Sequence, residues 1–127
     1  MRLIFTILSI VYISAIFILA GSPIVRILTP FNVYSLLHIP LYGILAFLLI
    51  FSIIPMTQLR NNLMTRFLMV GVIALGVGIS DEIHQAYVPG RDASATDILL
   101  DMVGIILVLF FVSRLVKRKK SFRSIIQ

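Results

Sequence analysis

The acidic side chains of this chain are gathered in one short region of an otherwise apolar sequence. The five acids all fall between positions 81 and 101, and they are Asp81, Glu82, Asp92, Asp97 and Asp101. Carboxylates accept hydrogen bonds from hydroxyl and amine groups, bind cations, or transfer protons as general acids and bases. Charged groups in apolar surroundings usually face a bundle interior, a partner or water. The clustering therefore predicts a polar site.

Four other polar side chains bring different chemistry to the same region, and they are His38, Tyr42, Gln85 and Arg91. The guanidinium of Arg91 suits an anion such as phosphate or carboxylate, which it binds with two parallel hydrogen bonds. Glu82 is a candidate general acid or base with His38 as its partner, and Asp97 is a third catalytic candidate. No motif in the sequence specifies a reaction, so the sequence does not determine which of these residues are catalytic.

A divalent cation is an alternative ligand for part of this set. His38, Glu82 and Asp97 together offer the imidazole and carboxylate ligands that such ions accept. The chain has no cysteine and no compact metal motif such as His-Glu-x-x-His. The sequence therefore predicts no metal and no cofactor.

The elements that position these residues are expected to be membrane-spanning helices. The chain has 127 residues, of which 60% are hydrophobic and 13% charged, too few charges to cover a soluble domain. Four apolar stretches approach the roughly 20 residues needed to cross a bilayer. They cover about residues 3–20, 37–56, 67–86 and 96–116, followed by a basic cytoplasmic tail at 117–127. We predict an all-α, polytopic membrane protein with a single four-helix transmembrane domain over residues 1–127.

The basic residues indicate how this bundle is oriented. With both termini in the cytoplasm, nine of the eleven Lys and Arg residues lie inside, and only Arg26 and Arg91 lie outside. This gives an N-in, C-in topology in which the segment 80–92 faces outwards. The net charge of +6 then reflects topology and anionic lipid rather than nucleic acid. The apolar loop at 21–35 is expected to lie in the membrane interface or to be an ordinary connection.

Helical periodicity predicts which side chains of the third span face inwards. At about 100° per residue, one stripe carries Gly71, Ala74, Gly78, Glu82 and Gln85. Asp81 lies on the shoulder of this stripe, while His84 points further round and is expected to pack or to lie at headgroup level. The turn at Pro89-Gly90 ends the helix and leads to Arg91.

The last span is expected to begin with a capped turn and two acids on one face. Ser94 or Thr96 is the predicted N-cap, with Asp97 in the first turn. Asp97 and Asp101 are spaced i, i+4, so the two like charges need a cation, a proton or water between them. The nearest cation in the sequence is Arg91. Counting residues from the basic ends places Glu82 and Asp101 at a similar level of the outer leaflet, and His38 joins them because the second span starts on the outside.

Two motifs in this layer resemble the VanZ-like family of bacterial membrane proteins, which is associated with teicoplanin resistance. They are HIPLY at 38–42 and SDEIHQAYVPGRDASATDILLDMVG at 80–104. The family's matching positions are His38, Tyr42, Ser80, Asp81, Glu82, Gln85, Arg91, Asp97 and Gly104. Asp101 departs from the asparagine that is common there and adds a negative charge. The resemblance implies a multi-pass protein of the bacterial cytoplasmic (inner) membrane acting at the cell envelope.

The sequence is compatible with three functions. The first is a polar outer-leaflet site that binds an anionic headgroup, a lipid-linked envelope precursor or a glycopeptide. Its binding candidates are His38, Tyr42, Asp81, Glu82, Gln85, Arg91, Asp97 and Asp101. The second is a membrane-embedded enzyme acting on a lipid- or peptidoglycan-linked substrate. The third is a partner subunit whose polar cluster only clamps helices. Expected partners are membrane lipids, with a second copy of the chain left open, and no nucleic acid.

Overall fold

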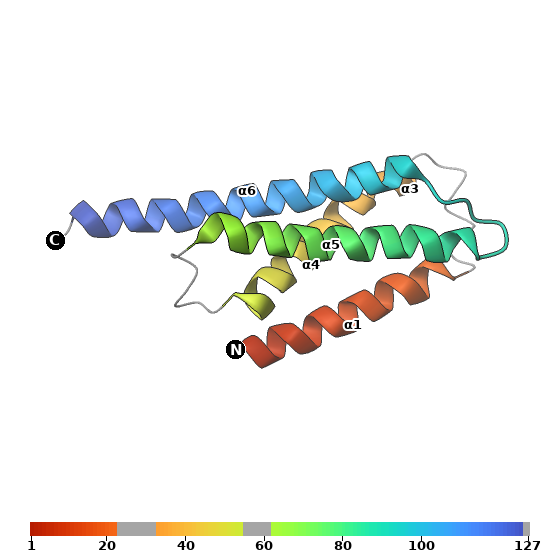
Figure 1. The fold of residues 1–127 in the computed structure, drawn as a ribbon, viewed down its shortest axis with the longest axis horizontal. Coiled ribbons are helices and arrows are strands. Elements are labelled where there is room, and N and C mark those ends of the chain that lie inside the picture. Colours follow the sequence, from red (N-terminus) through yellow and green to blue (C-terminus); the bar gives the residue numbers. More distant parts are fainter. Residues whose placement is uncertain (23–32, 55–61, 126–127) are drawn as a thin grey trace.

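The computed structural model describes residues 1–22, 33–54 and 62–125, with the backbone alone at 33–34 and 119–125. Within these ranges the regular structure is helical and no strand occurs. The helices are α1 (Arg2–Ala20), α3 (Val33–Leu36), α4 (His38–Ile53), α5 (Leu63–Ala86) and α6 (Ala95–Ile125). Figure 1 shows α5 and α6 running side by side, α4 crossing behind α5, and both termini towards the same end of the bundle.

Three of these helices are long and apolar enough to cross a membrane: α1, α5 and the part of α6 from Ala95 to Arg118. The expected four spans are therefore matched by three helices of full length and one shorter helix. With 16 residues, α4 is about 24 Å long, which is less than the roughly 30 Å of the hydrocarbon layer. It ends at Ile53 rather than near residue 56, because Ile54 is extended and precedes Pro55.

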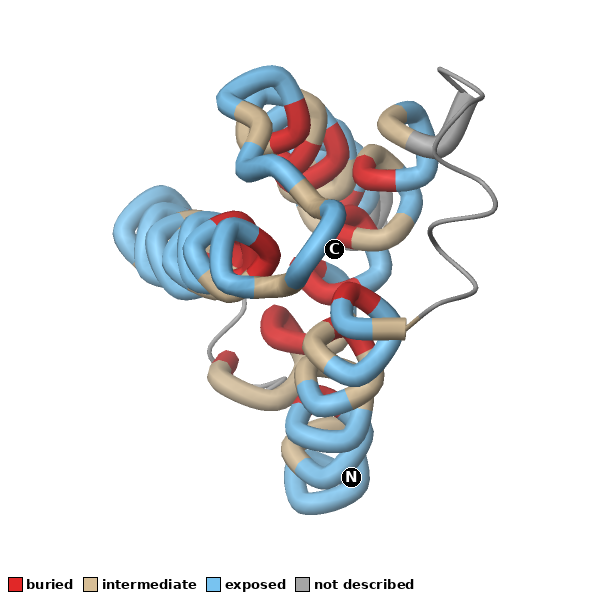
Figure 2. The backbone as a smooth tube through the Cα atoms, turned by 90° about the vertical axis from the view of Figure 1, so that its right-hand side faces the viewer, coloured by how far each residue is buried: buried red, intermediate tan, exposed pale blue. Residues whose placement is uncertain are grey.

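Large apolar side chains cover much of the surface of the bundle. Figure 2 shows buried positions turned towards the centre of the bundle and exposed positions turned outwards. The exposed positions include Leu3, Ile18, Met64 and Phe111, each more than 60% exposed. A continuous apolar surface of this kind would be unfavourable in water. It fits a protein whose helices are surrounded by lipid.

The central helix is α4, which packs against α1, α5 and α6. Its closest approach is to α6, at Gly43 and Gly104. A Cβ atom on Gly104 would collide with the carbonyl oxygen of Ile39 and lie 3.1 Å from the backbone nitrogen of Gly43. Small residues at a crossing let two membrane helices pack backbone against backbone. This contact fixes the start of α4 against the start of α6.

Other boundaries differ modestly from those expected. The α5 helix begins at Leu63 instead of 67, after Asn62 in a left-handed conformation. The α6 helix continues to Ile125, so the segment 117–127, expected as a tail, is helical through residue 125. Of the expected interfacial segment 21–35, residues 23–32 lie outside the described residues.

Candidate functional site

The predicted polar residues meet where α4 begins, α5 ends and α6 begins. Seven of the eight candidates are less than 10% exposed, and they are His38, Tyr42, Asp81, Glu82, Gln85, Asp97 and Asp101. The eighth, Arg91, is half-buried at the edge. We call these eight residues the polar cluster. The expected convergence of separate elements on one layer is therefore found in the structure.

The imidazole of His38 lies between the two carboxylates of α6. Its Nδ1 lies 2.8 Å from Asp101 Oδ1, and its Nε2 lies 3.7 Å from Asp97 Oδ2. The i, i+4 acids therefore have a histidine from another helix between them, where the sequence had pointed to Arg91. Because an ionised carboxylate only accepts hydrogen bonds, Nδ1–H donates to Asp101 and Nε2 is turned towards Asp97.

Glu82 is held by groups from its own helix and from the following loop. The backbone N–H of Ser94 donates to Glu82 Oε2 at 2.7 Å, and Gln85 Nε2 lies 3.4 Å from Glu82 Oε1. Gln85 Nε2 also donates to Asp81 Oδ2 at 2.9 Å. The other end of the same amide, Oε1, accepts a hydrogen bond from the guanidinium of Arg91. A chain of hydrogen bonds thus leads from the half-buried rim to the buried acids.

The third-span stripe faces the cluster as predicted. Asp81 lies deeper than its shoulder position indicated and is as buried as Glu82. Gly78 makes room for α6, since a Cβ there would lie 2.6 Å from Asp101 Oδ2 and 3.3 Å from Tyr42 Cε1. Tyr42 in turn stacks on His38, with ring centroids 6.1 Å apart. The small residue is therefore needed by the site as well as by helix packing.

Two polar side chains of the same region lie away from the cluster. His84 packs against α1, with its ring centroid 5.5 Å from that of Phe17, which confirms that it points off the Glu82 stripe. Asp92 is exposed in the loop between α5 and α6. Both residues are useful matched controls for the buried histidine and acids.

The loop residue Ser94 has two roles that the sequence showed only in part. Its side chain accepts a hydrogen bond from Asp97 N–H at 3.3 Å, which confirms it as the cap of α6. Its own backbone N–H binds Glu82, and this contact was not predicted, because every residue but proline carries such a donor. Gly43 was also missed as the partner of Gly104.

Replacing Ser94 with alanine should destabilise the protein by about 1 kcal/mol, because the first turn of α6 loses its side-chain cap. The measurement is the free energy of unfolding in detergent and SDS mixtures. Thr96→Ala is the matched control, since Thr96 was the other predicted cap and is exposed inside the helix. An equal loss in both variants would contradict the capping role of Ser94.

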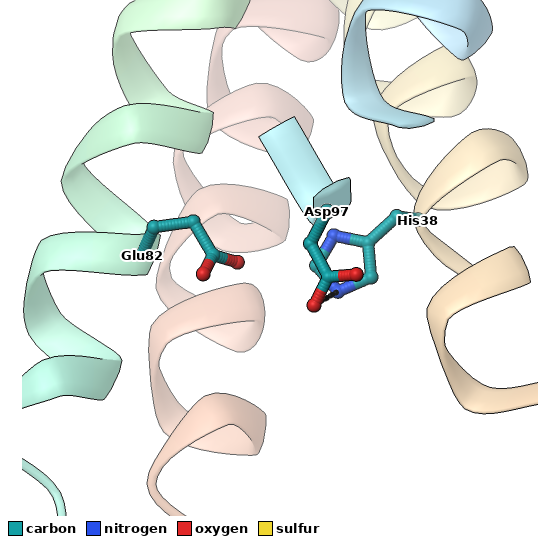
Figure 3. A group of neighbouring side chains, drawn as sticks. All are labelled: His38, Glu82 and Asp97. Carbon is teal, nitrogen blue, oxygen red and sulfur yellow. Dashed lines mark ion pairs between the residues drawn. The ribbon is translucent and has the colours of Figure 1, made fainter. Parts of the chain in front are cut away.

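One ligand atom from each of His38, Glu82 and Asp97 lies within 4.8 Å of the others. Figure 3 shows the three side chains pointing towards one another, with the ion pair between His38 and Asp97 drawn as a dashed line. These are the three residues that the sequence offered as an alternative metal set while predicting no metal. Each comes from a different helix. The arrangement can accept a cation, accept hydrogen bonds from a bound headgroup, or relay a proton.

Comparison with protein-family models, curated proteins and solved structures found no match. The polar cluster and the motifs that resemble the VanZ-like family are therefore the features that bear on function.

Proposed function

We propose that the chain is an integral protein of the bacterial cytoplasmic membrane that binds the polar headgroup of an envelope lipid or lipid-linked cell-wall precursor. In this proposal both termini face the cytoplasm and the polar cluster lies in the outer leaflet. The observation that carries it is the burial of seven polar side chains from three helices in one layer of an apolar bundle. Polar groups that deep in a membrane protein are costly and usually serve a ligand or transport path.

The composition of the polar cluster indicates which parts of a headgroup it would hold. The buried carboxylates of Glu82 and Asp97 accept hydrogen bonds from hydroxyl and amine groups, such as those of a sugar or a peptide. Arg91, at the half-buried rim, is the group that suits a phosphate. A headgroup carrying both a phosphate and hydroxyl or amine donors therefore fits better than a simple anion.

An apolar groove next to the cluster fits the lipid part of such a ligand. It lies between α5 and α6, with a volume of about 700 Å³, and its lining includes Phe67, Leu75, Met102 and Ile105. Leu75 lies about one turn from Gly78, and Met102 directly follows Asp101, so one end of the groove lies near the level of Asp101, and the groove extends from there to Leu63 and Lys117. One acyl or isoprenoid chain in the groove would place its headgroup beside the buried acids.

The resemblance to the VanZ-like family adds the envelope context and a phenotype. Sequestering or shielding a cell-wall precursor would lower the effect of a glycopeptide antibiotic such as teicoplanin, which acts on that material. A bacterial host that produces the chain should then tolerate more teicoplanin, and Arg91→Ala should lower this tolerance.

The binding test uses the purified full chain in detergent micelles and native mass spectrometry. The probes are undecaprenyl diphosphate, as a lipid-linked phosphate, and phosphatidylglycerol, as a membrane lipid. Arg91→Ala should weaken binding of the phosphate probe by about 10-fold or more, the effect of losing a hydrogen bond to a charged group. Arg118→Ala is the matched control, because Arg118 is exposed far along α6 and lines neither the groove nor the polar cluster.

Equal binding by the wild type and Arg91→Ala would contradict the proposal. Equal retention of both probes would identify a general lipid surface instead. If both Arg91→Ala and Glu82→Gln fail to accumulate in the membrane while Arg118→Ala accumulates, the polar cluster is a structural clamp.

A membrane-embedded enzyme is the second candidate, and the His38–Asp101 hydrogen bond is the observation that favours it. A carboxylate that orients an imidazole is a common arrangement for a general base. Here the opposite nitrogen, Nε2, faces Asp97 and Glu82. Glu82→Gln separates the two functions, because an enzyme would lose turnover of the lipid-linked probe while a binding protein would keep most of its affinity.

A further inference from the structure

We propose that His38, Glu82 and Asp97 bind a divalent transition-metal ion of the Zn²⁺ class, and that Asp101 holds the histidine in place for it. Each of the three ligand residues comes from a different helix: α4, α5 and α6. One ligand atom from each lies within 4.8 Å of the other two. The ion would bind whether or not a headgroup ligand is present, so this inference goes beyond the proposed function.

The distances are those of a site that closes with small side-chain movements. Two ligands about 2.1 Å from a tetrahedral ion lie about 3.4 Å apart. His38 Nε2 and Asp97 Oδ2 are 3.7 Å apart. Figure 3 shows the carboxylate of Glu82 approaching this pair from the opposite side. The three side chains therefore surround a common point rather than forming a row along one helix.

The hydrogen bond between His38 and Asp101 is the arrangement that metal-binding histidines use. A histidine ligand usually donates its second ring N–H to a carboxylate, which fixes the tautomer and aims the other nitrogen at the ion. Asp101 Oδ1 accepts from Nδ1 at 2.8 Å and is fully buried, so Nε2 is the nitrogen presented to Asp97. The hydrogen bond from Ser94 N–H orients Glu82 in the same way.

A second observation concerns the buried carboxylate of Asp97. Asp97 is 8% exposed, and its Oδ1 has no hydrogen-bond partner among the described residues. A buried carboxylate oxygen without a partner is costly. A cation beside Asp97 would reduce the repulsion between this carboxylate and the neighbouring acids. The site thus combines a buried carboxylate oxygen that has no hydrogen-bond partner with distances that suit a metal ion.

The ligand types indicate which cation fits. One imidazole nitrogen and two carboxylate oxygens suit Zn²⁺ and similar ions, while Mg²⁺ and Ca²⁺ prefer oxygen ligands throughout. Three protein ligands also leave a fourth position of a tetrahedral ion open. An added phosphate or hydroxyl group could take that position, which would let an acid-rich cluster hold an anionic headgroup.

The test is a Zn²⁺ titration by calorimetry of the full chain in detergent micelles, after chelator treatment and with a purification tag that lacks histidine. We expect one Zn²⁺ per chain, with no displacement by excess Mg²⁺. Asp97→Asn, which loses a charged ligand, should weaken binding at least tenfold. Asp101→Asn should weaken it by about 10- to 100-fold, as for other groups that orient a histidine ligand.

Matched controls use polar residues of the same region outside the site. His84→Ala and Asp92→Asn should bind Zn²⁺ as the wild type does, because His84 packs on α1 and Asp92 is exposed in the loop. Absence of stoichiometric Zn²⁺ binding by the folded wild type would overturn the proposal without any variant. Equal weakening by His84→Ala and Asp97→Asn would also overturn it.

The outcomes separate this site from the proposed headgroup function. Loss of Zn²⁺ binding with intact, Arg91-dependent lipid binding would reject the metal site alone. Stoichiometric Zn²⁺ binding without retention of either lipid probe would reject the headgroup function alone.

Discussion

Replacing Gly104 with alanine should destabilise the protein by about 3 kcal/mol or more, at the upper end of the range for overpacked cores. The added Cβ would collide with the carbonyl oxygen of Ile39 and lie 2.9 Å from its carbonyl carbon. Backbone atoms cannot rotate away as a side chain would, so α4 and α6 must separate. Because that crossing sets His38 against Asp97 and Asp101, the polar cluster should open with it. Unfolding in detergent and SDS mixtures measures the loss.

The same substitution at Gly76 is the control for this effect. Gly76 lies in α5, and among the described residues nothing lies within 4 Å of a Cβ built there. Alanine is favoured over glycine inside a helix by about 0.5–1 kcal/mol, so Gly76→Ala should be neutral or stabilising. A Gly104→Ala variant as stable as Gly76→Ala would mean that the close α4–α6 contact is not required.

The inward-facing residues of the site could be predicted because they follow one helical period. The stripe that runs from Gly78 to Glu82 and Gln85 depends only on the geometry of α5, and the structure buries all three. Counting residues from the basic ends was enough to place Glu82 and Asp101 at one level, since helix rise is constant. The position of a residue along the bundle axis can therefore be predicted from the sequence.

Which residues contact one another within that level could not be predicted in the same way. Whether His38 or Arg91 lies between Asp97 and Asp101 depends on how α4 is rotated and on how closely it approaches α6. That approach is set by Gly43 meeting Gly104, a contact between two helices far apart in the sequence. The bond from Ser94 N–H to Glu82 could not be predicted either, because it uses the backbone.

Removing the His38 side chain should have the largest effect of any single change at the polar cluster. His38→Ala would leave Asp97 and Asp101 one turn apart without the imidazole between them, and Asp101 is fully buried. Taking away the partner of a buried carboxylate leaves its charge uncompensated, which costs about 3–5 kcal/mol. That is a large part of the roughly 5–15 kcal/mol that stabilises a typical protein. Measuring the free energy of unfolding with a metal chelator present keeps any bound ion out of the comparison.

A second substitution shows whether uncompensated charge is the cause. Asp101→Asn removes one of the two acids and introduces an amide of almost the same shape. The double variant His38→Ala/Asp101→Asn should therefore be more stable than His38→Ala alone, although it carries one more mutation. His84→Ala, which removes a histidine that packs on Phe17 outside the cluster, should cost much less than His38→Ala. The losses of unfolding free energy in His38→Ala and Asp101→Asn would simply add in the double variant if the two sites were independent. That result would mean that the imidazole contributes packing volume rather than charge compensation.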